Sequence, residues 1–302
     1  MNTTFSQDLS TRAMLAGLSI SAWSAKRFDK KVSAEVAHAH GTSEDVGRYN
    51  KKLVADDEFL NEIRTQASAA RDYYYYNTLA WDDDGHRILN ASLYYDYMAK
   101  MEQFQNAFNA AADKFCDYSH WTEVVERAKG KLNGLFNPED YPRHQEIRRK
   151  FDLRVKISPL PASQDFRVAL DAVAVQQIQE AHEKAVEETI FRSMKDVYER
   201  IHHTVEDMAN RLGSMEITPE GKTLHAFRDS VTGNLQELLD VLPHLNIIND
   251  PSLNALGDSL RATLLQHSAQ SLRDNHIVRK NTAERAAEIA QKMAAFVGQM
   301  AA

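Results

Sequence analysis

The chain has a single cysteine, Cys116, among its 302 residues. One cysteine excludes an intramolecular disulfide framework and any zinc or iron–sulfur site that needs several thiolates. No apolar run reaches the roughly 18–20 residues of a membrane-spanning helix. The scattered glycines form neither a phosphate-binding loop with its lysine nor a dinucleotide fingerprint. We therefore expect a protein of the cytoplasm with no membrane contact, and one that does not itself hydrolyse nucleotides.

Basic residues are also in deficit, with 36 Lys and Arg against 43 Asp and Glu and a net charge of −7. This balance argues against a nucleic-acid coat protein, whose affinity comes from neutralising phosphates. The 43% of hydrophobic residues is ample for a core and excludes general disorder. Residues 13–25 have about the length of a signal-peptide apolar core, but the positive flank before them is poor. We expect a first core helix there.

Proline is absent before Pro138, and four prolines then fall between positions 138 and 161. Because proline breaks helix interiors, the first 137 residues can form long helices and the next stretch cannot. This pattern predicts three consecutive parts. They are an N-terminal helical hairpin domain (1–137), a linker with a short β-hairpin (138–170) and a C-terminal helical domain with one long helix (171–302).

Apolar residues in 60–74 and 94–118 recur at steps of three and four. Such heptad spacing predicts two antiparallel helices with coiled-coil-like seams, which meet near Tyr74 and Tyr94. The seams can pair within one chain or between copies of it.

Residues 151–157 alternate apolar and polar positions, which predicts a strand, and 166–170 could supply its partner. Residues 172–212 predict one long helix with an apolar seam from Ile190 to Leu212 and a stop at Gly213. Further helices are expected at 219–242, 252–274 and 280–300, capped by residues such as Thr218 and Ser252. The predicted fold is mainly α, with long helical hairpins, coiled-coil-like seams and a small central β-hairpin.

Tyrosine is concentrated where the two N-terminal seams are predicted to meet. Four consecutive tyrosines, 73–76, cover every side of a helix, so some of them leave the seam. Tyrosine buries a large area with few rotamers, which suits a protein interface, although it can also stack on unpaired bases. The predicted interface residues are Tyr73, Tyr75, Tyr76, Trp81 and Tyr95.

The one basic stretch is 143–156, where six basic residues face only Glu146 and Asp152. A solvated surface explains it most simply. If the stretch binds nucleic acid, the contacting residues are Arg148, Arg149, Lys150 and Arg154.

Two polar clusters contain residue types found in metal and catalytic sites. Asp82, Asp83 and Asp84 could hold a hard cation, but Arg87 and Leu93 stand where a calcium loop needs glycine and glutamate. This loop, up to His86, is the first place to look for an enzyme activity. His202 and His203 point about 100° apart on a helix and make a poor zinc pair without outside ligands. We therefore predict no catalytic residue, no metal and no cofactor.

Several short blocks of sequence together indicate a family resemblance, and the most specific are LFNPEDYP (135–142) and DFRV (165–168). Others are LSISAW (18–23) and TLAW (78–81). Over most of its length the chain resembles a family of unknown function carried by bacteriophages, conjugative plasmids and integrative elements. Ala80 and Asn90 stand where the family commonly has proline, a difference that concerns loop stiffness. The resemblance supplies no catalytic residue. It implies an accessory role, because members are often encoded beside a MoxR-type, cobaltochelatase-subunit-like AAA+ ATPase.

We therefore expect a non-enzymatic accessory or adaptor protein of a phage or mobile element. It would contact an AAA+ ATPase or another element-encoded protein in the cytoplasm of the host cell. Two alternatives remain open at this point. One is a nucleic-acid-binding module in element replication or recombination. The other is a self-assembling homo-oligomer that serves as a virion or inhibitor structural protein.

Overall fold

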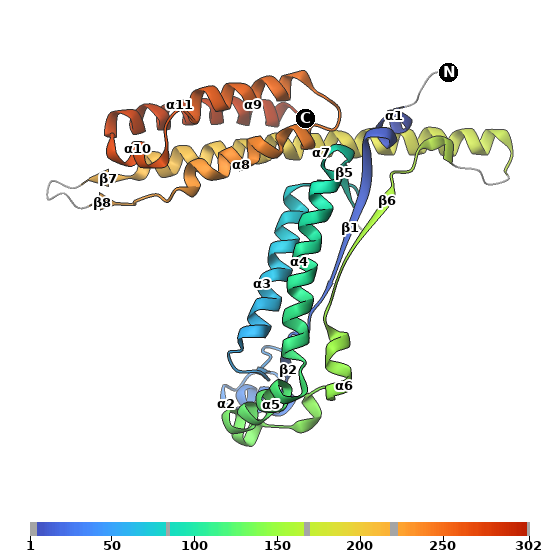
Figure 1. The fold of residues 1–302 in the computed structure, drawn as a ribbon, viewed down its shortest axis with the longest axis vertical. Helices are drawn as coiled ribbons and strands as arrows, with labels where there is room; N and C mark the ends of the chain where they lie inside the picture. Colours follow the sequence, from blue (N-terminus) through green and yellow to red (C-terminus); the bar gives the residue numbers. More distant parts are fainter. Residues whose placement is uncertain (1–4, 83–84, 166–169, 218–222, 301–302) are drawn as a thin grey trace. The chain divides into compact units, whose positions relative to one another are not determined.

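The computed structural model describes residues 5–82, 85–165, 170–217 and 223–300. The fold is mainly α with a small antiparallel sheet, which confirms the predicted fold class (Figure 1). The chain forms two compact units. Unit 1 comprises residues 1–17, 77–95 and 157–302, and unit 2 comprises 18–76 and 96–156. Each unit collects segments that are distant in sequence, whereas the three parts expected from proline are consecutive.

Unit 1 is organised around one long helix, α7 (Ala172–Ser214), which has 43 residues and is therefore about 65 Å long. Its predicted seam from Ile190 to Leu212 is buried at every position, as expected. Helices α8 (Ser230–Leu245) and α11 (His276–Gln299) pack along it (Figure 1). The helix continues one residue beyond Gly213, so the predicted stop at that glycine is slightly wrong.

The helices that follow α7 differ from the prediction in their ends. α8 begins at Ser230, not 219, and accommodates Pro243 in its last turn, where only His244 and Leu245 follow and a kink displaces little of the helix. The predicted helix 252–274 is two helices, α9 (Pro251–Leu264) and α10 (Ala269–Asp274). Asp250, not Ser252, caps α9. Thr218, the other expected cap, lies outside the described residues.

Strand β1 (Ala13–Ser21) occupies the segment for which the sequence predicted a core helix. In unit 1 its residues Ala13 to Ala16 pair antiparallel with β5 (Arg87–Asn90), which also pairs with β4 (Leu79–Ala80). The sheet order is β4-β5-β1-β6. The helix prediction is wrong because hydrogen bonding to strands more than 70 residues away outweighs a weak helical spacing.

Strand β6 (Asp152–Pro159) confirms the strand predicted from alternation. Its partner in the sheet is β1 rather than the expected segment 166–170, most of which lies outside the described residues. Unit 1 also contains helix α1 (Phe5–Arg12) and the short pair β7 (Glu216–Ile217) and β8 (Thr223–Leu224).

Unit 2 is built on α3 (Glu58–Tyr76) and α4 (Tyr94–Phe115), whose first two residues belong to unit 1. Every seam residue of α3 is buried, as predicted. The rings of Tyr73 and Tyr97 stack with centroids 5.7 Å apart, which joins the end of α3 to the start of α4 in the expected antiparallel sense (Figure 1). The α4 seam ends at Phe115, because Asp117 caps α5 (Tyr118–Leu132) and leaves Tyr118 exposed.

The core of unit 2 is aromatic. Phe115 is fully buried and makes edge contacts with His120, Trp121 and Phe151. The remaining elements of the unit are β2 (Lys26–Phe28), α2 (Lys30–Ala39), β3 (Asn50–Lys52) and α6 (His144–Ile147). β2 and β3 form a separate antiparallel pair.

Buried ion pairs and hydrogen bonds hold the loops of unit 2. The Lys51 ammonium lies 2.8 Å from Asp140 and 3.2 Å from Asp29, and it donates to the Leu135 carbonyl. The Tyr141 hydroxyl donates to the Leu53 carbonyl at 2.8 Å. Residues 135–142 therefore anchor a loop to β3.

A second tie joins α3 to α5. The Asp57 carboxylate, 1% exposed, lies 2.9 Å from His120 and 3.1 Å from Arg127. It also accepts the backbone N–H of Leu60 at the start of α3. Across the described ranges of the chain, no helix combines the length and apolarity needed to cross a membrane.

Candidate functional site

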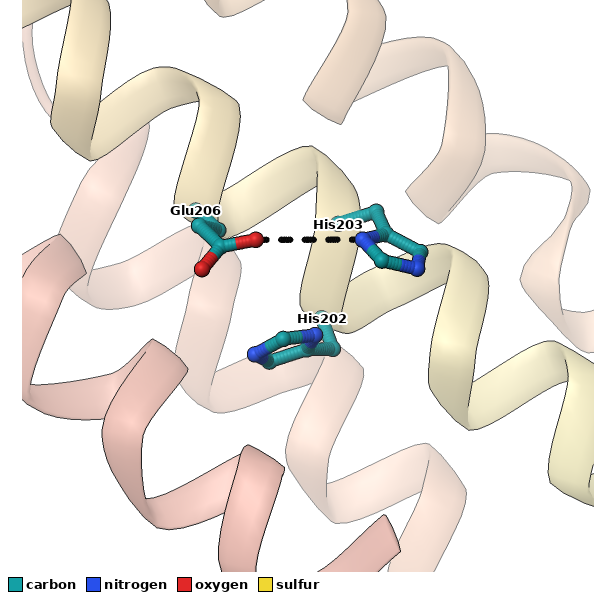
Figure 2. A group of neighbouring side chains, drawn as sticks. All are labelled: His202, His203 and Glu206. Atoms are coloured by element: carbon teal, nitrogen blue, oxygen red, sulfur yellow. Dashed lines mark ion pairs between the residues drawn. The ribbon is translucent and has the colours of Figure 1, made fainter.

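Three side chains with metal-binding atoms converge on α7. His202, His203 and Glu206 place ligand atoms within 4.8 Å of one another (Figure 2). Glu206 lies four residues after His202 and three after His203, so the helix brings its carboxylate next to both imidazoles. The carboxylate oxygen of Glu206 is 3.8 Å from Nδ1 of His203.

Two imidazoles and one carboxylate are a donor set suited to divalent zinc or iron and leave coordination positions open. However, His203 and Glu206 are exposed and His202 is half-buried. Among the described residues, no hydrogen bond orients either imidazole toward a metal ion. The group can hold a surface cation but does not enclose one. Sequence reasoning weighed the two histidines alone and missed Glu206, although the spacing His-His-x-x-Glu contains the signal.

The five predicted interface residues are divided between the units. In unit 2, Tyr75 is 51% exposed and Tyr76 37% exposed, whereas Tyr73 packs on Tyr97. In unit 1, Tyr95 is 82% exposed and lies edge-on to the ring of Tyr94, and Trp81 packs partly buried on the unit's core. Tyr75, Tyr76 and Tyr95 therefore present aromatic surface, while Tyr73 and Trp81 support the fold.

The four predicted nucleic-acid contacts have different roles in unit 2. Arg148 donates to Asp113, Asn109 and the Phe151 carbonyl, which makes it a structural residue. Arg154 is paired with Asp152. Arg149 and Lys150 are exposed, and in this fully described unit neither makes an ion pair.

The acidic loop after Trp81 is only partly described, since Asp83 and Asp84 lie outside the described residues. Asp82 accepts the backbone N–H of His86 at 2.9 Å, and its other oxygen is 3.1 Å from the His86 ring. Gly85 has a φ of +87°, a conformation that glycine adopts readily. The Asp82 carboxylate is thus engaged in closing the loop.

Two further groups have shifted pKa values. Burial raises the pKa of the Cys116 thiol to about 11, so the thiol stays protonated and unreactive at neutral pH. Burial also opposes the charge on Glu183, but hydrogen bonds from Ser6 and Ser163 outweigh it and lower the pKa of that carboxyl. Glu183 accepts the backbone N–H of Ser6 at 2.7 Å and so fixes the start of α1 in unit 1.

A comparison of the chain with protein-family models, with curated proteins and with solved structures finds no match in any of the three.

Proposed function

We propose that the protein is a non-enzymatic accessory protein of a phage or mobile element, which works through protein–protein contacts beside an AAA+ ATPase. The observation that carries this proposal is the exposure of tyrosines in both units, with Tyr95 82% exposed and Tyr75 51% exposed. Tyrosine is enriched in the energetically dominant centres of protein interfaces. The partner class rests on the family resemblance.

The state of the reactive groups supports a non-enzymatic role. Asp57 and Lys51, which are buried, are bound to opposite charges within unit 2. The thiol of Cys116 is held protonated by burial. These groups stabilise the fold, and none of them is left to act on a substrate.

The long helix of unit 1 offers a second contact surface. Phe191 on α7 is 52% exposed and is flanked by Glu187, Glu188 and Arg192. An apolar centre with a charged rim is the usual anatomy of a protein interface. The seam of the same helix is buried within one chain, so association between copies would have to use another surface.

The test is a tagged pull-down of the full chain from cells that express the whole surrounding gene cluster, washed at moderate and at high salt, with nuclease treatment in parallel. The expected result is recovery of the AAA+ ATPase that survives both treatments. Recovery that disappears with nuclease would show that nucleic acid bridges the two proteins and would overturn the proposal.

Single variants locate the contact. Tyr95→Ala and Tyr75→Ala are expected to reduce recovery about tenfold. Tyr118→Ala is the matched control, because Tyr118 is 69% exposed on α5 but was not assigned to the interface. An equal loss for all three variants would count against the assigned surface.

A further inference from the structure

A cleft of about 1020 Å³ in unit 2 is lined by four basic side chains. Every residue of this unit is described. The four are Lys26 on β2, Lys52 on β3, Arg64 on α3 and Lys131 near the end of α5, and all are exposed. They come from four separate segments, and none belongs to the basic stretch 143–156.

The basic side chains that line this cleft outnumber the carboxylates by four to one. None of the four cations forms an ion pair, and Arg64 only donates to the Ser24 carbonyl at 3.3 Å. One carboxylate, Asp56, lines the cleft, and it already accepts from the Asn61 amide at 2.7 Å. An anion that enters the cleft therefore meets three lysines that form no ion pair within this unit, and Arg64, whose guanidinium is bound only to a backbone carbonyl.

The pairing of β2 with β3 places basic residues directly opposite each other. Lys26 is directly opposite Lys52, and Arg27 is directly opposite Lys51. Like charges in opposed positions destabilise a strand pair unless an anion lies between them. Asp140 supplies that anion for the second pair, at 3.5 Å from Arg27 and 2.8 Å from Lys51. Lys26 and Lys52 are opposed in the same way, but no carboxylate of the described residues forms an ion pair with either of them.

The backbone at the cleft is strained. Ala25, which lines it, has a φ of +54°, a left-handed conformation that is costly for a residue with a side chain. Such strain collects at ligand-binding positions, where the surrounding structure maintains it.

The other lining groups suit a nucleobase. Tyr49 is 40% exposed, and the amides of Asn50 and Asn61 also line the cleft. The cleft volume lies at the top of the range of about 300–1000 Å³ for small-molecule sites, so it has room for more than a single phosphate. We propose that this cleft binds a nucleotide, free or within a short single-stranded segment, with its phosphates on Lys26 and Lys52 and its base on Tyr49.

The test measures binding of the full chain to a fluorescein-labelled single-stranded DNA of about 12 nucleotides by anisotropy, starting at about 50 mM salt. Lys26→Glu with Lys52→Glu is expected to weaken binding at least about tenfold. The slope of log affinity against log salt should become shallower by about 1.4, the equivalent of two phosphate contacts.

The matched control is Arg149→Glu with Lys150→Glu, which makes the same change of charge in the same unit outside the cleft. It is expected to change affinity by less than about threefold. Lys26→Arg with Lys52→Arg keeps the charge and should keep binding. Circular dichroism and melting curves that match wild type establish that each variant is folded.

Two further arms identify the ligand. Tyr49→Ala should lower affinity about 5- to 150-fold, the equivalent of one stacked base, without changing the salt slope. ADP that displaces the DNA, with the same dependence on Lys26 and Lys52, identifies a free nucleotide as sufficient. Failure of ADP to compete identifies a nucleic-acid strand.

Three results would overturn the proposal. One is the absence of DNA and ADP binding at about 100 µM protein and low salt. Another is an equal loss of binding in the cleft variant and in the control at 149 and 150. The third is competition by a polyglutamate peptide that equals that of the DNA, which would show a general anion surface or an acidic protein ligand. None of these results bears on the pull-down of the ATPase, so the two proposals fail separately.

Discussion

The two units differ in charge and in the chemistry of their cores. Unit 1 has 16 Lys and Arg against 24 Asp and Glu, whereas unit 2 has 20 against 19. The buried residues of unit 1 are mostly aliphatic, along α7, α8 and α11, while those of unit 2 centre on aromatic rings around Phe115. An acidic unit repels phosphate, so a nucleotide site belongs in the unit that is close to neutral and has unpaired cations.

The units also differ in the groups that bind their buried charged side chains. Unit 2 keeps Asp57 and Lys51 inside, each bound to groups from distant segments. Unit 1 buries Arg279, whose guanidinium donates to the carbonyls of Leu272 and Arg273 at the end of α10. Unit 1 is therefore held mainly by helix packing, and unit 2 by packing together with specific polar ties.

The largest expected effect is the loss of the aromatic centre of unit 2. Phe115→Ala should lower the free energy of unfolding by about 3–5 kcal/mol, because it leaves a cavity among three rings. Urea unfolding followed by tryptophan fluorescence measures this, since Trp23 and Trp121 report from unit 2. A cost below about 1 kcal/mol would contradict the central position of Phe115.

The next effect concerns the polar ties. Lys51→Met should cost about 3 kcal/mol, because it leaves Asp29 and Asp140 facing each other with little access to water. The backbone N–H of Val32, then Lys51, lower the pKa of Asp29 below its ordinary 3.8. The stabilising contribution of Asp29 is therefore full above about pH 4 and is lost as the pH falls through the lowered pKa. Urea unfolding from pH 7 to pH 3 should show a shallower loss of stability in the variant than in the wild-type protein.

A smaller effect is expected in unit 1. Glu183→Gln should cost about 1 kcal/mol at pH 7, since a charged acceptor for Ser6 is replaced by a neutral one. Because the pKa of Glu183 lies below its ordinary 4.5, wild type loses this advantage as the pH falls below that value. Thermal melts at pH 7 and pH 3 should show a smaller difference between the two proteins at pH 3 than at pH 7. A difference that persists unchanged at pH 3 would exclude ionisation as its cause.

The smallest effect is expected at the surface of α7. Zinc at about 10 µM should raise the stability of the protein by less than about 1 kcal/mol, because His203 and Glu206 are exposed and closed structural sites need four ligands. Calorimetric melts with and without zinc measure the shift, and Glu206→Gln should abolish it. A rise of several kcal/mol would mean that further ligands complete the site.

The fold could be predicted from the sequence where it depends on contacts between residues that are close along the chain. The seams of α3 and α7 follow from steps of three and four along the sequence, and their burial confirms the prediction. β1 was missed because its partners lie in β5 and β6, far along the chain. The ion pair between Lys51 and Asp140 was also not predicted, because the two residues are far apart along the chain.

The candidate sites also include some features that are visible in the sequence and others that only the structure shows. The run of tyrosines is visible in the sequence, although only the structure separates exposed Tyr75 from packed Tyr73. The basic cleft was not predictable, since Lys26, Lys52 and Lys131 lie far apart in the sequence and meet only in the folded unit. The one basic stretch that the sequence does show contains Arg148, which the fold uses for internal bonds.

The most direct test of the proposed function is the affinity of the purified full chain for the AAA+ ATPase encoded beside it under that proposal, measured by biolayer interferometry. The expected dissociation constant is in the micromolar range or tighter. The triple variant Tyr75→Ala/Tyr76→Ala/Tyr95→Ala should weaken it at least about tenfold. Lys26→Glu with Lys52→Glu should leave it unchanged. No measurable binding, or a tyrosine variant that binds as tightly as wild type, would contradict the proposed role.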